Sequence, residues 1–164
     1  MSSGTFFSPA TADDTVSERY VTVVLACLDG SDASMQAVEY AVAVAERYGA
    51  SLHALHVVDD ETSRALEHGA IDPATVAAFC RECLDHVDDL ASEEGIEVSE
   101  SCARGFSPRR KGHHPGTVVL ETADHVGADF IVLPRGSVAD DPVAVLDSAA
   151  EYVLSYASQP VLSV

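Results

Sequence analysis

An apolar run from Val21 to Leu28 ends abruptly at Asp29-Gly30, and a long helical pattern begins a few residues later. A nearly continuous apolar strand that ends in a glycine turn before a helix is typical of a central strand in a parallel sheet, which is buried on both faces. In such sheets, ligands bind in the crevice at the carboxyl ends of the strands. We therefore expect Asp29 to lie at the edge of any small-molecule site.

The rest of the chain alternates between strand and helix patterns. We expect strands at 20–28, 51–58, 96–103, 129–133 and 160–164, a polar connection at 59–72, and helices at 33–47, 73–94, 117–126 and 148–157. Asp72 and Asp147 are placed to cap the second and fourth helices. Because each crossover contains a helix, the sheet is expected to be parallel, in a three-layer α/β/α sandwich. Right-handed connections favour the strand order 3-2-1-4-5, with the topological switch point between the first and fourth strands.

Length and composition indicate one globular domain. The chain has 164 residues, of which 47% are hydrophobic, enough for a sizeable core. Residues 1–18 are polar and aperiodic, and we interpret them as a mobile arm before a domain at 19–164. They lack the basic and apolar regions of a signal peptide, and no apolar run reaches the roughly 18–20 residues of a membrane span. We expect a cytoplasmic protein with no membrane partner.

The charge is strongly acidic. The chain has nine Lys and Arg residues and 27 Asp and Glu residues, which gives a formal net charge of −18. Such a composition is typical of proteins from a halophilic organism, where molar salt screens charges within about 3 Å. The alternative is an acidic surface that attracts a cationic partner. Under either interpretation no nucleic-acid partner is expected, because self-repulsion opposes phosphate contacts.

Five segments, in order and at matching spacing, carry a family resemblance. They are 28–34 (LDGSDAS), 50–58 (ASLHALHVV), 127–133 (GADFIVL), 148–154 (SAAEYVL) and 159–164 (QPVLSV). Together they resemble the universal stress protein (UspA-like) family over about residues 20–164. The resemblance implies the Rossmann-like fold of the adenine nucleotide alpha hydrolase-like proteins. It also implies a family with both ATP-binding and non-binding members.

In ATP-binding members, a loop of the form Gly-x2-Gly-x9-Gly-Ser/Thr follows the fourth strand. Its backbone N–H groups and the start of the last helix hold the phosphates. The resemblance implies nucleoside contacts for Asp29 and Val57. When the loop is aligned on Gly136, the first glycine position falls on Leu133, and the third falls on Leu146 or Asp147.

This degenerate loop argues against tight ATP binding. Ser148 alone remains of the terminal Gly-Ser pair, followed by Ala149 in the last helix. An Asp147 cap would occupy the N–H groups that a phosphate needs and would repel its charge. Pro134 removes a further N–H donor, and Arg135 supplies one compensating charge. The adenosine half of a nucleotide site can therefore remain without its phosphate half.

The leading hypothesis is a dimeric, non-catalytic stress-response regulator or binding module, since no catalytic constellation stands out. The apolar edge strand Pro160–Val164 invites pairing with a second copy, so we expect a homodimer. The alternative is an adenine-nucleotide-binding protein, for ATP or AMP, with at most slow hydrolysis. Its candidate binding residues are Asp29, Val57, Leu133, Arg135, Gly136, Ser148 and Ala149. No metal site is expected, and no cofactor is expected other than ATP or another adenine nucleotide under the alternative.

Two interpretations of the Asp29 side chain remain open. It either accepts a hydrogen bond from a ribose or adenine, or it ends the strand and caps the following helix. The segment Gly30–Ser34 is faintly similar to the phosphate loop of ATP pyrophosphatases, but it lacks the paired glycines that let the backbone approach pyrophosphate. A helix cap is the favoured interpretation of that segment.

Two further stretches concentrate reactive side chains. Segment 104–114 holds four of the nine basic residues, which either reach over the crevice, bind an acidic partner, or only neutralise acidic surface. Cys80-x2-Cys83-x2-His86 lies within one helix, where the favoured interpretation is small buried hydrophobes rather than zinc ligands. Outside this helix, Cys102 and His125 are single candidates for further zinc ligands, and no second pair is evident. His53 and His56 fall on opposite faces of their strand, so they cannot chelate one ion together.

Overall fold

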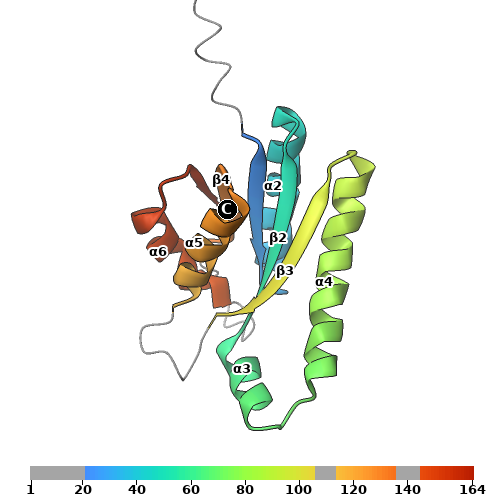
Figure 1. Cartoon of the computed structure of the whole chain (residues 1–164), viewed down its shortest axis with the longest axis vertical. Helices are drawn as coiled ribbons and strands as arrows, with labels where there is room; N and C mark the ends of the chain where they lie inside the picture. Colours follow the sequence, from blue (N-terminus) through green and yellow to red (C-terminus); the bar gives the residue numbers. More distant parts are fainter. Residues whose placement is uncertain (1–20, 106–113, 136–144) are drawn as a thin grey trace, which may run out of the picture.

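The computed structural model describes residues 21–105, 114–135 and 145–164. The elements in chain order are β1 (Val23–Leu28), α2 (Asp32–Tyr48), β2 (Ser51–Val58), α3 (Asp60–Glu67), α4 (Pro73–Glu93), β3 (Val98–Arg104), α5 (Pro115–Val126), β4 (Phe130–Leu133), the 3-10 turn η2 (Val145–Asp147), α6 (Ala149–Tyr156) and β5 (Val161–Ser163) (Figure 1). The alternation of strands and helices expected from the sequence is confirmed.

The five strands form one sheet in the order β3-β2-β1-β4-β5, and all four neighbouring pairs are parallel. Both the strand order and the Rossmann-like α/β class expected from the sequence are confirmed. The central strand β1 lies between β2 and β4. The switch point therefore lies between β1 and β4, directly after Leu28 on one side and Leu133 on the other.

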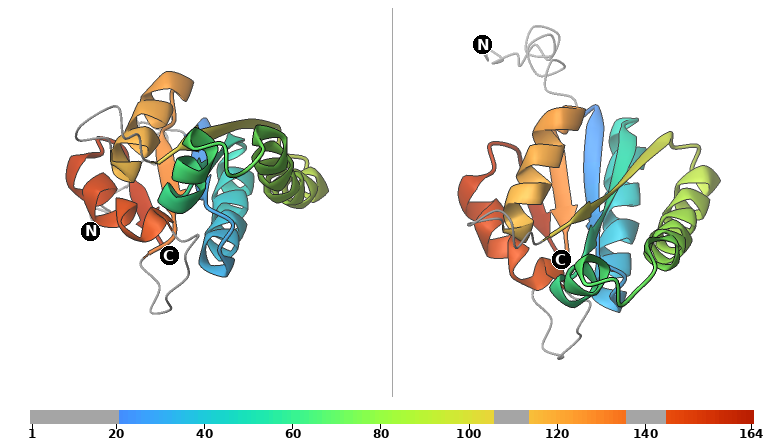
Figure 2. Two further views of the ribbon diagram at one scale, coloured as in Figure 1. Left: turned by 90° about the horizontal axis from the view of Figure 1, so that it is seen from below. Right: turned by 60° about the horizontal axis from the view of Figure 1, so that its bottom comes forward.

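Helices cover both faces of the sheet, with α2 and α4 on one side and α5 and α6 on the other (Figure 2). The alternation of side chains along β1 explains why this strand is apolar throughout. Its even-numbered residues from Val24 to Leu28 pack under α2 and α4, whereas Leu25 and Cys27 pack under α5 and α6. Across the described ranges, no helix combines the length and apolar character needed to cross a bilayer.

The expected polar connection at 59–72 contains a helix that the sequence did not predict. Helix α3 runs from Asp60 to Glu67, with Asp59 as its N-cap. The Asp59 carboxylate accepts from the backbone N–H of Thr62 at 2.8 Å. Because Ser63 is its only buried residue, α3 lacks the apolar stripe by which helices are recognised in a sequence.

The start of the last helix also differs from the expectation. Asp147 is not the N-cap; it closes the turn η2, and Ser148 occupies the cap position without a side-chain cap hydrogen bond. Helix α5 begins at Pro115, two residues earlier than expected, with His114 as its cap. The strands are slightly displaced, with β1 beginning at Val23 and β3 covering 98–104.

Parts of the sequence predictions fall outside the described residues. They include the mobile arm at 1–18, Gly136, and most of the basic stretch at 104–114. At the described ends of that stretch, Arg104 pairs with Glu67 at 3.8 Å, and the His114 ring stacks on Tyr152 at a centroid distance of 4.7 Å.

Candidate functional site

Asp29 lies at the carboxyl end of β1, as expected, but its carboxylate is already engaged. Oδ1 accepts hydrogen bonds from the backbone N–H and the hydroxyl of Ser31, the former at 3.0 Å. Oδ2 accepts from the backbone N–H of Leu146 at 3.1 Å. Asp29 is only 2% exposed. The carboxylate therefore ties the start of α2 to the η2 turn across the switch point.

The side chain that caps α2 is Ser31, not Asp29. Ser31 Oγ accepts from the backbone N–H of Ser34 at 3.2 Å, and the Ser34 hydroxyl donates back to the Ser31 carbonyl. Gly30 makes the preceding turn with a φ of 86°, in the left-handed region that glycine adopts without strain. Asp29 supports this cap indirectly, because it holds Ser31 in place.

The apolar candidates lie together in one core. Val57, Leu133 and Ala149 are fully buried, in the same cluster as Val145 and Leu146 of η2. Gly105 approaches this cluster closely. A Cβ at position 105 would lie 2.9 Å from a methyl of Val57 and 3.1 Å from a methyl of Val145.

The polar candidates lie at the periphery. Arg135 is exposed, and its backbone N–H donates to the Val164 carbonyl at 2.7 Å. Ser148 is exposed, and its hydroxyl donates to the Val145 carbonyl at 3.2 Å. The structure therefore packs Val57, Leu133 and Ala149 into one buried cluster with η2, and Asp29 is joined to this cluster by its hydrogen bond from Leu146.

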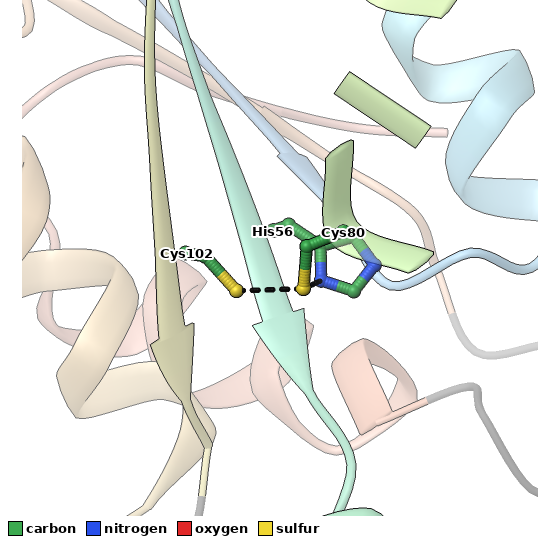
Figure 3. A group of neighbouring side chains, drawn as sticks. All are labelled: His56, Cys80 and Cys102. Atoms are coloured by element: carbon green, nitrogen blue, oxygen red, sulfur yellow. Dashed lines mark hydrogen bonds between the residues drawn. The ribbon is translucent and has the colours of Figure 1, made fainter. Parts of the chain in front are cut away.

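A second cluster lies on the other face of the sheet, where His56, Cys80 and Cys102 converge (Figure 3). The two sulfur atoms are 2.8 Å apart, and Cys80 Sγ lies 3.4 Å from His56 Nδ1. His56 and Cys80 are buried, whereas Cys102 is exposed. A cavity of about 530 Å³ adjoins the pair, lined by both cysteines and by residues of α4 and β3.

The three side chains of this cluster differ from the sequence motif. Cys83 is half-buried and His86 is exposed, and neither belongs to the cluster. Cys102 joins it because β2 and β3 pair with His56 directly opposite Cys102. The strand register was the signal that could have linked them, since neighbouring parallel strands place paired side chains on the same face.

The surroundings of the two thiols shift their pKa values in opposite directions. The hydrogen bond between the two sulfur atoms, in which either can be the donor, lowers the pKa of Cys102 below its usual range. The same hydrogen bond, followed by burial, raises the pKa of Cys80. His56 Nε2 is buried and has no hydrogen-bond partner among the described residues. Chemically, the cluster offers an accessible thiol with a lowered pKa, a buried thiol and an imidazole.

His53 lies on the opposite face from His56, as the spacing predicted. Its two ring nitrogens contact the hydroxyls of Ser99 and Ser101 at 2.7 and 2.8 Å. Burial, and then the charge of His125, lower the pKa of His53. His53 is thus a hydrogen-bonded residue of the sheet, with both ring nitrogens engaged.

Residues 21–164 match the model of the universal stress protein family. The chain is also 28% identical to the universal stress protein MJ0531 of Methanocaldococcus jannaschii over 139 residues, which cover 83% of this chain and 77% of the relative. The chain therefore belongs to the universal stress protein family, as its sequence segments predicted.

Solved structures show the same fold. The universal stress protein UspA from Lactobacillus plantarum superposes with a TM-score of 0.67 at 24% identity, covering 88% of this chain and 98% of that one. A universal stress protein in complex with cAMP superposes with a TM-score of 0.60 at 24% identity, covering 88% and 97%. At these identities, the likeness concerns the fold.

Proposed function

We propose that this universal stress protein is a non-catalytic, dimeric binding module whose nucleotide crevice is closed by its own η2 turn. The observation that carries the proposal is the hydrogen bond from Leu146 N–H to Asp29 Oδ2. It occupies the carboxylate that would otherwise face a nucleoside. Leu146 is fully buried in the same core cluster as Val57, for which the resemblance implies a nucleoside contact.

Displacing the η2 turn costs free energy, and this cost opposes ligand binding. Exposing a buried leucine side chain costs about 1.5–3 kcal/mol, and releasing a hydrogen bond to a carboxylate costs about 1.5–3 kcal/mol more. A nucleotide that displaced the turn would lose roughly 3–6 kcal/mol of binding free energy, or about 10²- to 10⁴-fold in affinity. A site with a micromolar dissociation constant would thereby bind only at about 0.1–10 mM nucleotide.

Calorimetric titration of the full chain with ATP, AMP and cAMP tests this proposal. We expect no binding tighter than about millimolar. Leu146→Ala shortens the side chain that fills the crevice, so it should strengthen AMP binding by about tenfold or more. Leu154→Ala, at an exposed position of α6, is the matched control and should leave affinity unchanged. Micromolar binding by the unmodified chain would contradict closure.

A second candidate function is adenine-nucleotide binding after the turn opens. It is supported by Asp29 and Val57, which retain the residue types of nucleotide-binding members, and by the related structure in complex with cAMP. In that case Asp29→Asn should weaken the binding measured with the unmodified chain. If nucleotide affinity is measurable and insensitive to Asp29→Asn, binding occurs elsewhere.

Dimerisation is proposed through β5, which lies at one edge of the sheet. The Pro160 carbonyl and the Val164 N–H face β4, so by alternation the backbone groups of Val161 and Ser163 face the open edge. Unpaired backbone groups at a sheet edge favour strand pairing with a second copy. Two-fold symmetry would make this contact self-complementary.

The single substitution Ser163→Pro tests the edge contact, because it removes one outward N–H donor and leaves the hydrogen bonds of Pro160 and Val164 to β4 in place. We expect its molar mass by light scattering to fall from dimer to monomer. Ser163→Ala retains the N–H and should remain dimeric. A dimer of unchanged stability in Ser163→Pro, or in a chain lacking 160–164, would refute β5 as the interface.

A further inference from the structure

We propose that Cys80 and Cys102 form a redox-active dithiol, in which Cys102 reduces a small hydroperoxide and Cys80 then closes a disulfide between α4 and β3. This site lies on the face of the sheet opposite the closed crevice, and it does not depend on nucleotide binding. Figure 3 shows the pair with His56 beside it.

The position of the two sulfur atoms supports disulfide formation. They lie 2.8 Å apart, one on the helix α4 and the other on the edge strand β3. A disulfide bond is about 2.05 Å long, so the sulfur atoms need to approach by less than about 1 Å. Helix α4 packs directly against β3, so this approach requires no rearrangement of the fold.

The two cysteines have the different environments that a peroxide-reactive pair requires. Cys102 is exposed beside the 530 Å³ cavity, which admits a small oxidant. Its thiol pKa is lowered by the hydrogen bond from Cys80, so more of it is thiolate, the nucleophilic form. Oxidation-sensitive cysteines are typically accessible, low in pKa and adjacent to a second cysteine that resolves them. Cys80 is 3% exposed and occupies that second position.

The other cysteines of the chain lack these features. Cys27 is fully buried in β1, and burial followed by the charge of Asp29 raises its pKa. Burial followed by the charge of Cys80 raises the pKa of Cys83. Cys83 therefore provides a matched control on the same helix, three residues after Cys80.

His56 is placed to position and stabilise Cys80 rather than to contact the oxidant. In the tautomer that carries a proton on Nδ1, His56 donates to Cys80 Sγ at 3.4 Å, and Cys80 donates to the Cys102 thiolate. When Cys80 gives up its proton, the His56 N–H remains to stabilise the negative charge on its sulfur. His56 lies opposite Cys102 in the strand register, so the sheet itself fixes this geometry.

The chemistry balances in two steps. The Cys102 thiol first loses its proton, and the thiolate attacks the hydroxyl oxygen of the hydroperoxide. The O–O bond breaks, Cys102 becomes a sulfenic acid, and the hydroxide or alkoxide that leaves takes up a proton equivalent to the one that Cys102 lost. Cys80 sulfur then attacks the Cys102 sulfur, the S–O bond breaks, and the Cys80 proton leaves with the hydroxyl group as water. Overall, two thiols are oxidised to one disulfide, and one hydroperoxide is reduced to water and an alcohol or second water.

A bound soft metal ion is the competing use of these side chains, because His56, Cys80 and Cys102 offer ligand atoms within 4.8 Å of one another. Two thiolates that share a tetrahedral zinc ion at about 2.3 Å lie roughly 3.8 Å apart. The observed separation of 2.8 Å is closer to a disulfide. No fourth side chain joins this group among the residues the structure describes. The geometry therefore favours the dithiol.

The test oxidises the reduced full-length chain with hydrogen peroxide, blocks the remaining thiols, and maps the peptides without reduction. Trypsin cuts after Arg64, Arg81 and Arg104, so Cys80 leaves on peptide 65–81, and Cys83 and Cys102 share peptide 82–104. We expect these peptides to be linked, with two thiols lost per chain. The Cys83→Ser variant should give the same link and assigns it to Cys102.

Three variants distinguish the roles of Cys80, Cys102 and His56. Cys80→Ser should accumulate a sulfenic acid at Cys102 that a 1,3-diketone reagent traps, and Cys102→Ser should slow peroxide oxidation of Cys80 at least tenfold. His56→Leu should slow disulfide closure about tenfold without slowing sulfenic acid formation. The matched control His86→Ala, at an exposed position on α4, should change neither rate. Circular dichroism confirms that each variant is folded.

The proposal is overturned if peroxide produces no link between the two peptides in the folded, unmodified chain. It is also overturned if the reduced chain holds one equivalent of zinc that protects both cysteines from peroxide and is lost in Cys102→Ser. That result would assign the cluster to metal binding. Neither outcome depends on whether the η2 turn closes the nucleotide crevice, so the two proposals fail independently.

Discussion

Two polar sites in this protein use buried side chains in opposite ways. At the switch point between β1 and β4, where we propose a closed crevice, both oxygens of Asp29 accept hydrogen bonds from the chain itself. In the dithiol cluster, His56 Nε2 has no partner among the described residues, and Cys102 is exposed. Polar groups whose hydrogen bonds are satisfied internally stabilise a fold, whereas an accessible thiolate remains available for chemistry.

The difference has a clear consequence for substitution. Removing an acceptor at the crevice leaves buried N–H donors unsatisfied, which costs about 1–3 kcal/mol for each donor. Removing the exposed Cys102 thiol leaves little buried and unsatisfied. Substitutions at the crevice should therefore reduce stability, and substitutions in the dithiol should change reactivity.

The largest expected effect is that of Asp29→Ala on the free energy of unfolding. Because the backbone N–H groups of Ser31 and Leu146 both lose their acceptor, we expect a loss of about 2–5 kcal/mol, measured by urea denaturation. Asp32→Ala is the matched control, since Asp32 is exposed in the first turn of α2 and should cost at most about 1 kcal/mol. Equal losses for the two variants would show that Asp29 does not hold the crevice closed.

A second prediction contrasts thiols on the two faces of the sheet. In the folded, reduced chain we expect Cys102 to react with iodoacetamide at least about 100-fold faster than Cys27, a difference of about 2.7 kcal/mol in activation free energy. Cys27 is fully buried, and burial raises its pKa, whereas the Cys102 pKa is lowered. Peptide mapping over time measures both rates. In urea the rates should converge, and a persistent difference would contradict burial as the cause.

The sequence predicted the sheet because its signals are local. Continuous apolar runs and helix-ending glycines indicate strands and their connections without knowledge of tertiary contacts, and they placed Asp29 at the switch point correctly. The contact between Asp29 and Leu146 joins positions 117 residues apart, and it depends on how η2 packs. Helix α3 was missed because it has an N-cap but no buried apolar stripe, which is the signal by which a helix is predicted. The partnership of Cys102 with Cys80 required the register of β3.

Other sequence inferences remain predictions. The −18 net charge suggests a protein adapted to high salt, and thermal melts that rise with molar salt would support that origin. The β5 dimer and the absence of a nucleic-acid partner also await measurement. These properties depend on surfaces and partners rather than on the core, so apolar periodicity does not determine them.

Packing at the crevice gives a third prediction. A Cβ at Gly105 would lie 2.9 Å from a methyl of Val57 and 3.1 Å from a methyl of Val145, so Gly105→Ala should destabilise the chain by about 1–3 kcal/mol. Val145→Ala removes one of the two obstructing methyls. In a double-mutant cycle the combined loss should be smaller than the sum of the single losses by about 0.5 kcal/mol or more. Additive losses would mean that η2 does not pack on Gly105 in solution.

The smallest expected effect concerns Asp129, a carboxylate that resembles Asp29 but is only half-buried. It joins the amino ends of β1 and β4, where its Oδ2 accepts from Thr22 N–H, the Thr22 hydroxyl and Val23 N–H. Burial raises its pKa, but these three hydrogen bonds outweigh burial and lower it overall. The resulting stability is present above the unfolded pKa of about 3.9 and is lost as the pH falls through the folded pKa.

Asp129→Asn should therefore lower stability at pH 7 by about 0.5–1 kcal/mol, because solvent screens a half-exposed site. Urea denaturation at pH 7 and at progressively lower pH measures the difference from the unmodified chain. The difference should shrink below about pH 4, since the protonated carboxyl loses the charge that strengthens its hydrogen bonds. A difference that stays constant with pH would mean that these bonds stabilise the fold without regard to charge. The difference between Asp29 and Asp129 in their contribution to stability would then be explained by burial alone.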